Sequence, residues 1–395
     1  MKSENDMAKR PVALNGNVLF VGAAFPPSIG GSVVVMQELL RNFDPKSYNV
    51  VTLRANGDSG DSAFERRTLR VGVKRLRPYR LGMWVRFLQV PFTVRKACRY
   101  AVECEAKAIV CIFPTIDFLL LANLMAKRTG LPLILYLHDT IVEALSGSTF
   151  ALPSRILQKS VFKRASRIMV MSEGMERLYL QKYGLKTYSI PHTYPEKIDC
   201  ESDLGGCVTR QLFWGGAVYN ANNHALARVV AAAKLRSVPF LFTTKNSKAL
   251  MNSLGECEES SCVKATYYGT RAEYLSALPV GGILVLALNY PDETEYGEEE
   301  VGTIFPTKTP EYLASGAPIL VHCPEHYFIA KYVKEKGCGL VVSERDPEVI
   351  AMAIERLLSN DSEVRSMRLK ARETARDFEP MRICEKFSRV ISEGC

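Results

Sequence analysis

The residues best suited to chemistry lie in one segment, residues 303–321 (TIFPTKTPEYLASGAPILV). Pro310 suits the first turn of a helix, and Gly316 can end that helix before a strand-like run. Glu311 falls in the first turn, where a carboxylate can accept two hydrogen bonds from the vicinal hydroxyls of a ribose. Lys308 stands just ahead and can neutralise phosphate. A purely local role is the alternative, because the helix dipole alone stabilises a Glu there.

The loop 25–32 (FPPSIGGS) is a second candidate, since it joins an apolar strand-like run to a segment with helical spacing. Gly30 and Gly31 would let the backbone approach a ligand closely, and free amides at a helix start favour an anion such as a diphosphate. The loop lacks the G-x-G-x-x-G dinucleotide pattern, and a plain tight turn is the alternative.

His138 is the best single polar candidate in the first half of the chain. It follows the apolar run 133–137 and precedes Asp139, which places an imidazole where parallel sheets bind their ligands. A histidine that only caps a helix or bonds a carbonyl is the alternative. We expect structural roles for the other four histidines, His192, His224, His322 and His326.

The elements that must position these residues alternate between strand and helix, the pattern of a parallel sheet covered on both faces. The alternation runs to about residue 171, is broken by the polar, turn-rich stretch 195–206 and then starts again. We therefore predict an α/β protein with two doubly wound Rossmann-like domains. The predicted divisions are an N-terminal Rossmann-like domain (1–195), a linker (196–208), a C-terminal Rossmann-like domain (209–378) and a final helix (379–395).

Length and composition agree with two ordinary globular domains: 395 residues, 47% hydrophobic and 24% charged. The longest apolar stretch, 108–126, is interrupted by Pro114, Asp117 and Asn123, which favours a strand and helix over a membrane span. The eleven cysteines form no Cys-x-x-Cys pair, as expected of reduced thiols. We predict a cytoplasmic protein without a metal site.

The net charge of +9 is concentrated between residues 66 and 99, which hold eleven Lys or Arg and no Asp or Glu. Cations mixed with aromatic residues suit an anionic membrane surface, so a peripheral location on the inner face of the membrane is expected. Arginines paired with distant carboxylates on a solvated face are the alternative. Nucleic acid is not expected, because no recognised binding module accompanies the charge. The predicted membrane patch consists of Arg75, Arg77, Arg80, Trp84, Arg86 and Phe87.

Residues 305–320 (FPTKTPEYLASGAPIL) resemble the donor-binding segment of the family 4 glycosyltransferases, retaining enzymes of the GT-B fold, whose two Rossmann-like domains face each other across a cleft. Further similarities follow in the same order along the chain: the Gly30 and Gly31 loop, His138 with Asp139, residues 165–172 (ASRIMVMS) and residues 188–192 (YSIPH). The resemblance spans nearly the whole chain. It implies that residues 1–195 bind the acceptor, that residues 209–378 bind the nucleotide-sugar and that the final helix, 379–395, packs back on the N-terminal domain.

The resemblance implies a role for each matching residue. Glu311 would hold the donor ribose, while backbone amides of Ile304 to Thr307, a segment that also contains Phe305 and Pro306, would hold the sugar or diphosphate. His138 would contact the transferring sugar, and the Gly30 and Gly31 loop would lie against the diphosphate. Such enzymes need no metal or cofactor beyond the nucleotide-sugar substrate, and no Asp-x-Asp motif occurs here.

The sequence departs from the family pattern at two places. The family usually carries a Glu eight residues before the ribose-binding one, where this chain has Thr303. It also commonly has an Arg and a Lys after the first strand of the second domain, where residues 215–223 (GGAVYNANN, including Gly216) contain no basic residue. Lys308 or Lys245 would have to supply the positive charge near the leaving diphosphate.

The leading hypothesis is transfer of a sugar from a nucleotide-sugar to a saccharide or lipid-linked acceptor, with retention and without metal. A nucleotide-sugar epimerase on the same fold and a non-catalytic, glycosyltransferase-like binding protein are the alternatives. The epimerase would form product without any acceptor, and failure to bind any nucleotide would favour the binding protein.

Overall fold

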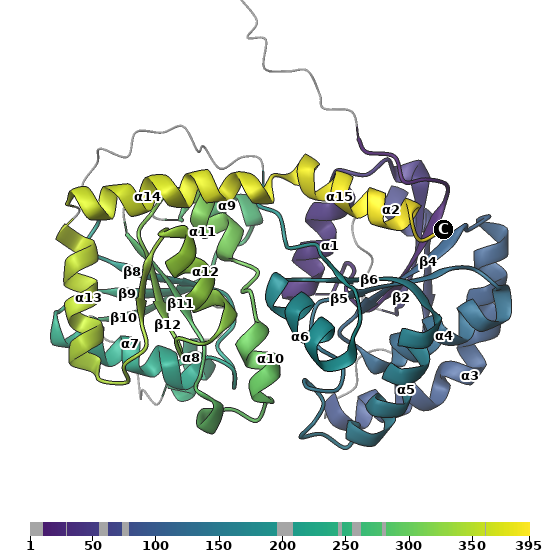
Figure 1. Ribbon diagram of the computed structural model, residues 1–395, viewed down its shortest axis with the longest axis horizontal. Coiled ribbons are helices and arrows are strands. Elements are labelled where there is room, and N and C mark those ends of the chain that lie inside the picture. Colours follow the sequence, from purple (N-terminus) through teal and green to yellow (C-terminus); the bar gives the residue numbers. More distant parts are fainter. Residues whose placement is uncertain are drawn as a thin grey trace, which may run out of the picture. The chain divides into compact units, whose positions relative to one another are not determined.

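The computed structural model describes residues 11–28, 30–54, 62–72, 79–195, 208–243, 247–254, 262–278, 282–359 and 361–395. These residues form two compact units. Unit 1 comprises residues 1–142, 152–191 and 380–395, and unit 2 comprises residues 143–151 and 192–379. Each unit is a parallel sheet with helices packed on it (Figure 1), so the predicted pair of α/β halves is confirmed.

The sheet of unit 1 has seven parallel strands in the order β3-β2-β1-β4-β5-β6-β7. The chain reverses direction across the sheet at β1, as in doubly wound folds. The strands are β1 Val18–Gly22, β2 Tyr48–Leu53, β3 Thr68–Val71, β4 Ala108–Phe113, β5 Leu133–Leu137, β6 Ala165–Val170 and β7 Tyr188–Ser189. The helices are α1 Gly31–Arg41, α2 Ser62–Arg66, α3 Tyr79–Glu103, α4 Ile116–Thr129, α5 Ala151–Arg164, α6 Glu173–Tyr183 and α15 Pro380–Ser392.

Local sequence explains the central strands of unit 1. Strands β1, β4 and β5 are apolar and buried along their whole length, as expected where helices cover both faces of a sheet. Gly22 allows β1 to approach β4, because a Cβ there would lie 2.8 Å from the carbonyl oxygen of Ile112. Helix α6 begins where the Ser172 hydroxyl accepts the Met175 amide and ends at Gly184, which is left-handed.

The last helix, α15, belongs to unit 1. Its Phe387 ring contacts the rings of Phe20, Phe43 and Tyr136, with centroids 5.4–6.2 Å apart. The Cys384 thiol donates to the Leu39 carbonyl of α1. The chain thus returns to the unit in which it began, and its C-terminal helix completes that unit's core.

Unit 2 has six parallel strands in the order β10-β9-β8-β11-β12-β13. The strands are β8 Leu212–Gly215, β9 Phe240–Thr243, β10 Val263–Thr266, β11 Ile283–Ala287, β12 Ile319–His322 and β13 Leu340–Val342. The helices are α7 Asn223–Leu235, α8 Ser247–Leu254, α9 Arg271–Ser276, α10 Glu298–Thr303, α11 Thr309–Ser315, α12 Phe328–Lys336, α13 Pro347–Ser359 and α14 Ser362–Ala375.

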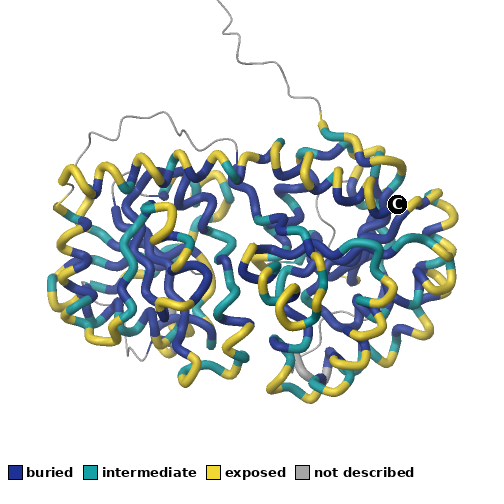
Figure 2. The backbone as a smooth tube through the Cα atoms, viewed as in Figure 1, coloured by how far each residue is buried: buried dark blue, intermediate teal, exposed yellow. Residues whose placement is uncertain are grey.

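Burial follows the layers of each unit. The strands and the inward sides of the helices are buried, whereas exposed residues lie on the outer turns of the helices and in loops (Figure 2). In unit 2 the apolar side chains form two clusters, one containing Trp214 and Phe240 and the other Phe213 and Tyr312. Of the predicted linker, residues 196–207 lie outside the described part of the chain.

Candidate functional site

Glu311 is fully buried in unit 2. It lies in the first turn of α11, a seven-residue helix with Pro310 near its start and a left-handed Gly316 at its end. Its side chain is 2% exposed and forms an ion pair with the guanidinium of Arg271. The Nε2 atom of His192 lies 3.9 Å from Glu311 Oε1. A carboxylate removed from water needs such partners, because burying it alone is very costly.

Arg271 is the first residue of α9, and the turn before it fixes its position. Thr270 and Glu273 form a capping box, each side chain bonding the other's backbone amide. The guanidinium carbon lies 5.2 Å from the ring centroid of Tyr274, and 30% of the side chain is exposed. Sequence reasoning missed Arg271. The capping box shows only that a helix begins there.

The loop after β8 packs tightly against two tyrosines. The Gly215 amide donates to the Tyr312 hydroxyl at 2.9 Å. A Cβ on Gly215 would lie 2.2 Å from the Tyr274 hydroxyl oxygen, so this position requires glycine. Gly216 has φ +117°, a conformation that favours glycine. The glycine pair therefore keeps backbone atoms close to α11.

Lys308 lies beside this glycine loop. Its Nζ atom is 2.9 Å from the ring centroid of Trp214, whose indole N–H donates to the Gly216 carbonyl at 3.0 Å. Burial lowers the pKa of Lys308 well below its ordinary value. An arriving diphosphate would favour the protonated form, because an anion offsets the cost of burying the charge.

The remaining predicted donor residues of unit 2 play different parts. The Thr303 hydroxyl donates to the Glu299 and Glu300 carbonyls of its own helix. The Phe305 ring stacks on Phe378 in the core, with centroids 5.5 Å apart, so only its backbone is available for a ligand. The Pro306 carbonyl accepts the Thr309 amide. Thr307 is partly exposed, and Lys245 lies outside the described residues.

In unit 1, His138 follows β5, and its amide donates to the Phe113 carbonyl at the end of β4. The imidazole packs edge-on against Tyr136, with centroids 4.5 Å apart. Part of the residue is exposed, but both ring nitrogens are inaccessible and have no hydrogen-bond partner among the described residues. Burial lowers the pKa of His138 to about 3 and raises that of Asp139 to about 6. The imidazole is therefore neutral at physiological pH.

Gly30 precedes α1, with φ +150° and open space where a Cβ would lie. Gly31 begins the helix and is exposed, and no side chain caps this end. Strands β1, β4 and β5 are parallel neighbours, so this loop and His138 follow strands at the same carboxyl edge of the sheet. The Gly30 and Gly31 loop and His138 thus lie at the sheet edge where parallel sheets bind ligands.

Comparison with known proteins identifies the first half of the chain. Residues 30–189 match the family model described as a glycosyl transferase 4-like domain. Residues 30–189 are therefore similar to a glycosyl transferase 4-like domain, and the chain as a whole has the GT-B fold. A search of curated protein sequences gave no significant match.

Solved structures resemble the whole chain, not only the glycosyl transferase 4-like domain. Sucrose-phosphate synthase of Thermosynechococcus elongatus has a TM-score of 0.67 and 16% identity, covering 95% of this chain and 98% of its own. HepE of Anabaena, in complex with UDP and glucose, has a TM-score of 0.66 and 14% identity, and the match covers 95% of this chain and 99% of HepE. Trehalose 6-phosphate synthase of Burkholderia multivorans has a TM-score of 0.63 and 12% identity, and the match covers 96% of this chain and 97% of the synthase. At these identities the likeness establishes the fold.

The predicted membrane patch, at the start of α3 in the glycosyl transferase 4-like domain, is corrected at Arg86. That side chain is buried and forms a 2.9 Å ion pair with Asp117 of α4, because its position on α3 faces the neighbouring helix. Trp84 and Phe87 are half-buried and pack on each other, with centroids 6.0 Å apart. Arg75, Arg77 and the side chain of Arg80 lie outside the described residues.

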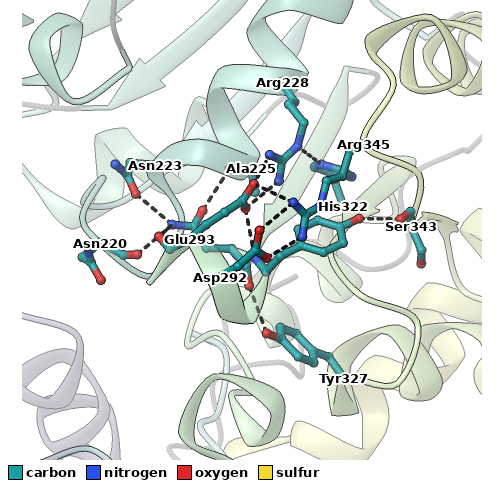
Figure 3. A network of polar contacts seen from close by, with 12 residues as sticks. Asn220, Asn223, Ala225, Arg228, Asp292, Glu293, His322, Tyr327, Ser343 and Arg345 are labelled. Atoms are coloured by element: carbon teal, nitrogen blue, oxygen red, sulfur yellow. Dashed lines mark hydrogen bonds and ion pairs between the residues drawn. The ribbon is translucent and has the colours of Figure 1, made fainter. Parts of the chain in front are cut away.

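A polar network in unit 2 holds the loops after β11 and β12 (Figure 3). Arg228 of α7 binds the Glu293 carboxylate through both terminal nitrogens, at 2.5 and 2.9 Å, and donates from Nε to His322. Burial lowers the pKa of His322 to about 4, so it accepts this bond as a neutral ring. Asn289 is fully buried and accepts the Ala225 amide at 2.9 Å. The sequence shows no pattern for this network beyond the acidic residues 292–300 (DETEYGEEE), which include Glu293.

None of the described helices is both long enough and apolar enough to span a bilayer. The same part of the chain contains no group of three or more His, Cys, Asp or Glu side chains placed to hold a metal ion.

Proposed function

We propose that the chain is a glycosyltransferase that transfers a sugar from a nucleotide-sugar to a saccharide or lipid-linked acceptor, with retention and without metal. One observation carries the proposal: the first turn of α11 carries the buried Glu311 carboxylate, and Lys308, the residue before α11, lies beside Gly216 in the glycine loop after β8. A carboxylate, a cation and close backbone amides are what ribose hydroxyls and a diphosphate require.

The donor would replace contacts that the protein now makes with itself. Vicinal ribose hydroxyls would donate to Glu311 and take the place of the Arg271 guanidinium on that carboxylate. The diphosphate would lie near Gly216 and Lys308, whose amine would gain a proton as the anion arrives. Arg271 is also a cation, and its partly exposed side chain would remain beside the nucleotide.

Charge on the departing diphosphate would then be met by Lys308, Arg271 and backbone amides. The acceptor hydroxyl would pass its proton to the diphosphate as it attacks the anomeric carbon, and no covalent intermediate is proposed. His138 would contact the transferring sugar as a neutral imidazole. Inversion would need a carboxylate or another base positioned for the acceptor.

The donor site is tested by measuring nucleotide binding with thermal shift and calorimetry. The ligands are the diphosphates of uridine, guanosine and adenosine and the corresponding nucleotide-sugars. Glu311→Gln should weaken binding of the preferred nucleotide roughly 30-fold, the equivalent of about 2 kcal/mol for two charge-assisted hydrogen bonds. Glu335→Gln, at an exposed position of α12, is the matched control and should bind normally. Equal affinity of the Glu311 variant and the control would contradict the proposal.

Activity is tested with an acceptor panel of saccharides and polyprenyl phosphates. The anomeric configuration of the product, read by NMR, decides retention, and an unchanged rate in EDTA supports transfer without metal. Conversion of the donor sugar in the absence of any acceptor would instead establish the epimerase.

A further inference from the structure

Three helices of unit 1, α3, α4 and α5, carry an unusual outer surface. Five large apolar side chains on α3 and α5 point to solvent: Leu88 (65% exposed), Phe92 (83%), Val102 (72%), Leu152 (68%) and Ile156 (66%). Single exposed apolar residues are ordinary, but five on two helices of one layer mark a surface that binds something. We call the exposed side of these helices the α3–α5 face.

The exposed residues follow helical spacing. On α3, Leu88, Phe92, Arg95, Arg99 and Val102 are separated by four, three, four and three residues, which places them along one stripe. On α5 the exposed positions have the same character, with Leu152 and Ile156 followed by lysines a turn apart. Apolar and basic side chains are therefore interleaved on each helix.

The charge of the α3–α5 face has one sign. Its exposed cations include Arg95, Lys96 and Arg99 on α3 and Arg155, Lys159 and Lys163 on α5. Over the described side chains of the three helices, the carboxylates are Asp117, buried against Arg86, and Glu103, near the end of α3. A merely solvated surface would carry both signs and few large apolar side chains.

The three helices form a fixed layer. The buried pair of Arg86 and Asp117 joins α3 to α4. Asn123 of α4 donates to the Ser160 hydroxyl and accepts from Arg164, both on α5. Figure 1 shows the three helices on one side of the unit 1 sheet. The α3–α5 face therefore needs no rearrangement to present its side chains.

We propose that the α3–α5 face docks the protein on an anionic lipid membrane. Cations attract the anionic headgroups, while Phe92, Leu88 and the apolar residues of α5 enter the boundary between headgroups and acyl chains. This surface differs from the predicted patch at residues 75–87, whose Arg86 is buried. Nucleic acid would bind the cations but leaves the apolar stripes without a partner. The proposal goes beyond sugar transfer and holds whether or not the chain is a transferase.

Vesicle flotation of the full chain tests the proposal, with vesicles of phosphatidylglycerol mixed with phosphatidylcholine and of phosphatidylcholine alone. Wild type should float with the anionic vesicles only. Arg95→Glu with Lys159→Glu should lower the partition coefficient more than roughly tenfold, since each cation near an anionic surface contributes roughly fivefold. Phe92→Ser with Ile156→Ser should lower it by a similar factor.

Matched controls lie in unit 2, where Lys331→Glu and Leu369→Ser alter exposed residues of the same types and should float as wild type does. All variants should keep the wild-type unfolding temperature and nucleotide affinity, which separates loss of docking from loss of the donor site. Equal losses in the controls, or no flotation of wild type, would overturn the proposal. Tighter binding to single-stranded RNA than to vesicles would also overturn it. So would a dimer of the wild-type chain in sedimentation that the Phe92→Ser variant does not form.

Discussion

The carboxylate of Glu311 is ion-paired with the guanidinium of Arg271, forty residues earlier in the chain. One partner is buried in the first turn of α11 and the other begins α9 and is partly exposed. In the proposed donor site this guanidinium holds the carboxylate until ribose hydroxyls replace it. The pair links the stability of the nucleotide-free protein to nucleotide binding.

Arg271→Ala should lower the free energy of unfolding of the nucleotide-free protein by about 2 kcal/mol, because the Glu311 carboxylate loses its guanidinium while staying buried. A bound nucleotide would restore hydrogen bonds to that carboxylate, so saturating nucleotide should recover part of the loss. Chemical denaturation with and without nucleotide measures both. Arg236→Ala, which removes two ion pairs with the exposed carboxylates of Glu348 and Glu355, is the control and should show no such recovery. A loss unaffected by nucleotide would show that Arg271 is only structural.

Gly215→Ala should cost about 2 kcal/mol of stability, because the new methyl group would overlap the Tyr274 hydroxyl oxygen at 2.2 Å. It should also weaken nucleotide binding by displacing the loop from α11. Gly302→Ala, in α10, brings only an ordinary 3.5 Å contact and serves as the control. Thermal denaturation and nucleotide titration of the two variants provide the comparison. Equal behaviour would mean that the loop accepts a side chain.

Lys308→Met should flatten the dependence of stability on pH. The folded pKa of Lys308 is lowered, so between that value and 10.5 the unfolded chain binds more protons at this residue than the folded chain does. Wild-type stability should therefore rise with pH in this window, and the variant should lose that contribution. Calorimetry in buffers of different ionisation enthalpy should further detect proton uptake when nucleotide binds wild type. Identical uptake by the variant would assign the proton to another group.

His138→Phe should reduce turnover about 100-fold and leave nucleotide affinity unchanged, since His138 lies in the other unit from the proposed nucleotide site. The pKa of His138 falls from 6.5 to about 3, so wild type loses stability through this residue as the pH drops from 6.5 towards 3. Asp139 acts in the opposite sense, because its raised pKa of about 6 favours folding at low pH and that benefit is lost as the pH rises through 6.

The variant should therefore lose less stability than wild type between pH 6.5 and pH 4, as followed by denaturant titrations. His224→Phe is a comparison at an exposed histidine of α7. If His138→Phe kept full turnover, the imidazole would have no part in the reaction.

Arg86→Met should destabilise unit 1 by about 3 kcal/mol, because it leaves the Asp117 carboxylate buried without its partner. Arg86→Met combined with Asp117→Leu should recover most of the loss, since apolar pairs of similar volume replace buried ion pairs well. Vesicle flotation by the double variant should match wild type, because neither residue lies on the α3–α5 face. A double variant as unstable as the single one would show that the pair does not act as a unit.

The sequence by itself determined the two α/β halves and the position of the candidate residues. Apolar runs at strand length, helical spacing between them and the polar break near residue 200 depend only on local periodicity, so they could be read without coordinates. Pro310 and Gly316 likewise bound α11 through their own backbone preferences, which placed Glu311 in its first turn.

Tertiary structure alone decided which side chains meet. The contact of Arg271 and His192 with Glu311 depends on where α9 and the end of the chain segment after β7 pack, and no local pattern encodes that. The same holds for Arg86. The basic stretch around it predicted an exposed side chain, but the packing of α3 on α4 buries it. A buried charge finds its partner through the arrangement of whole elements, whereas secondary structure follows from residues that are neighbours in sequence.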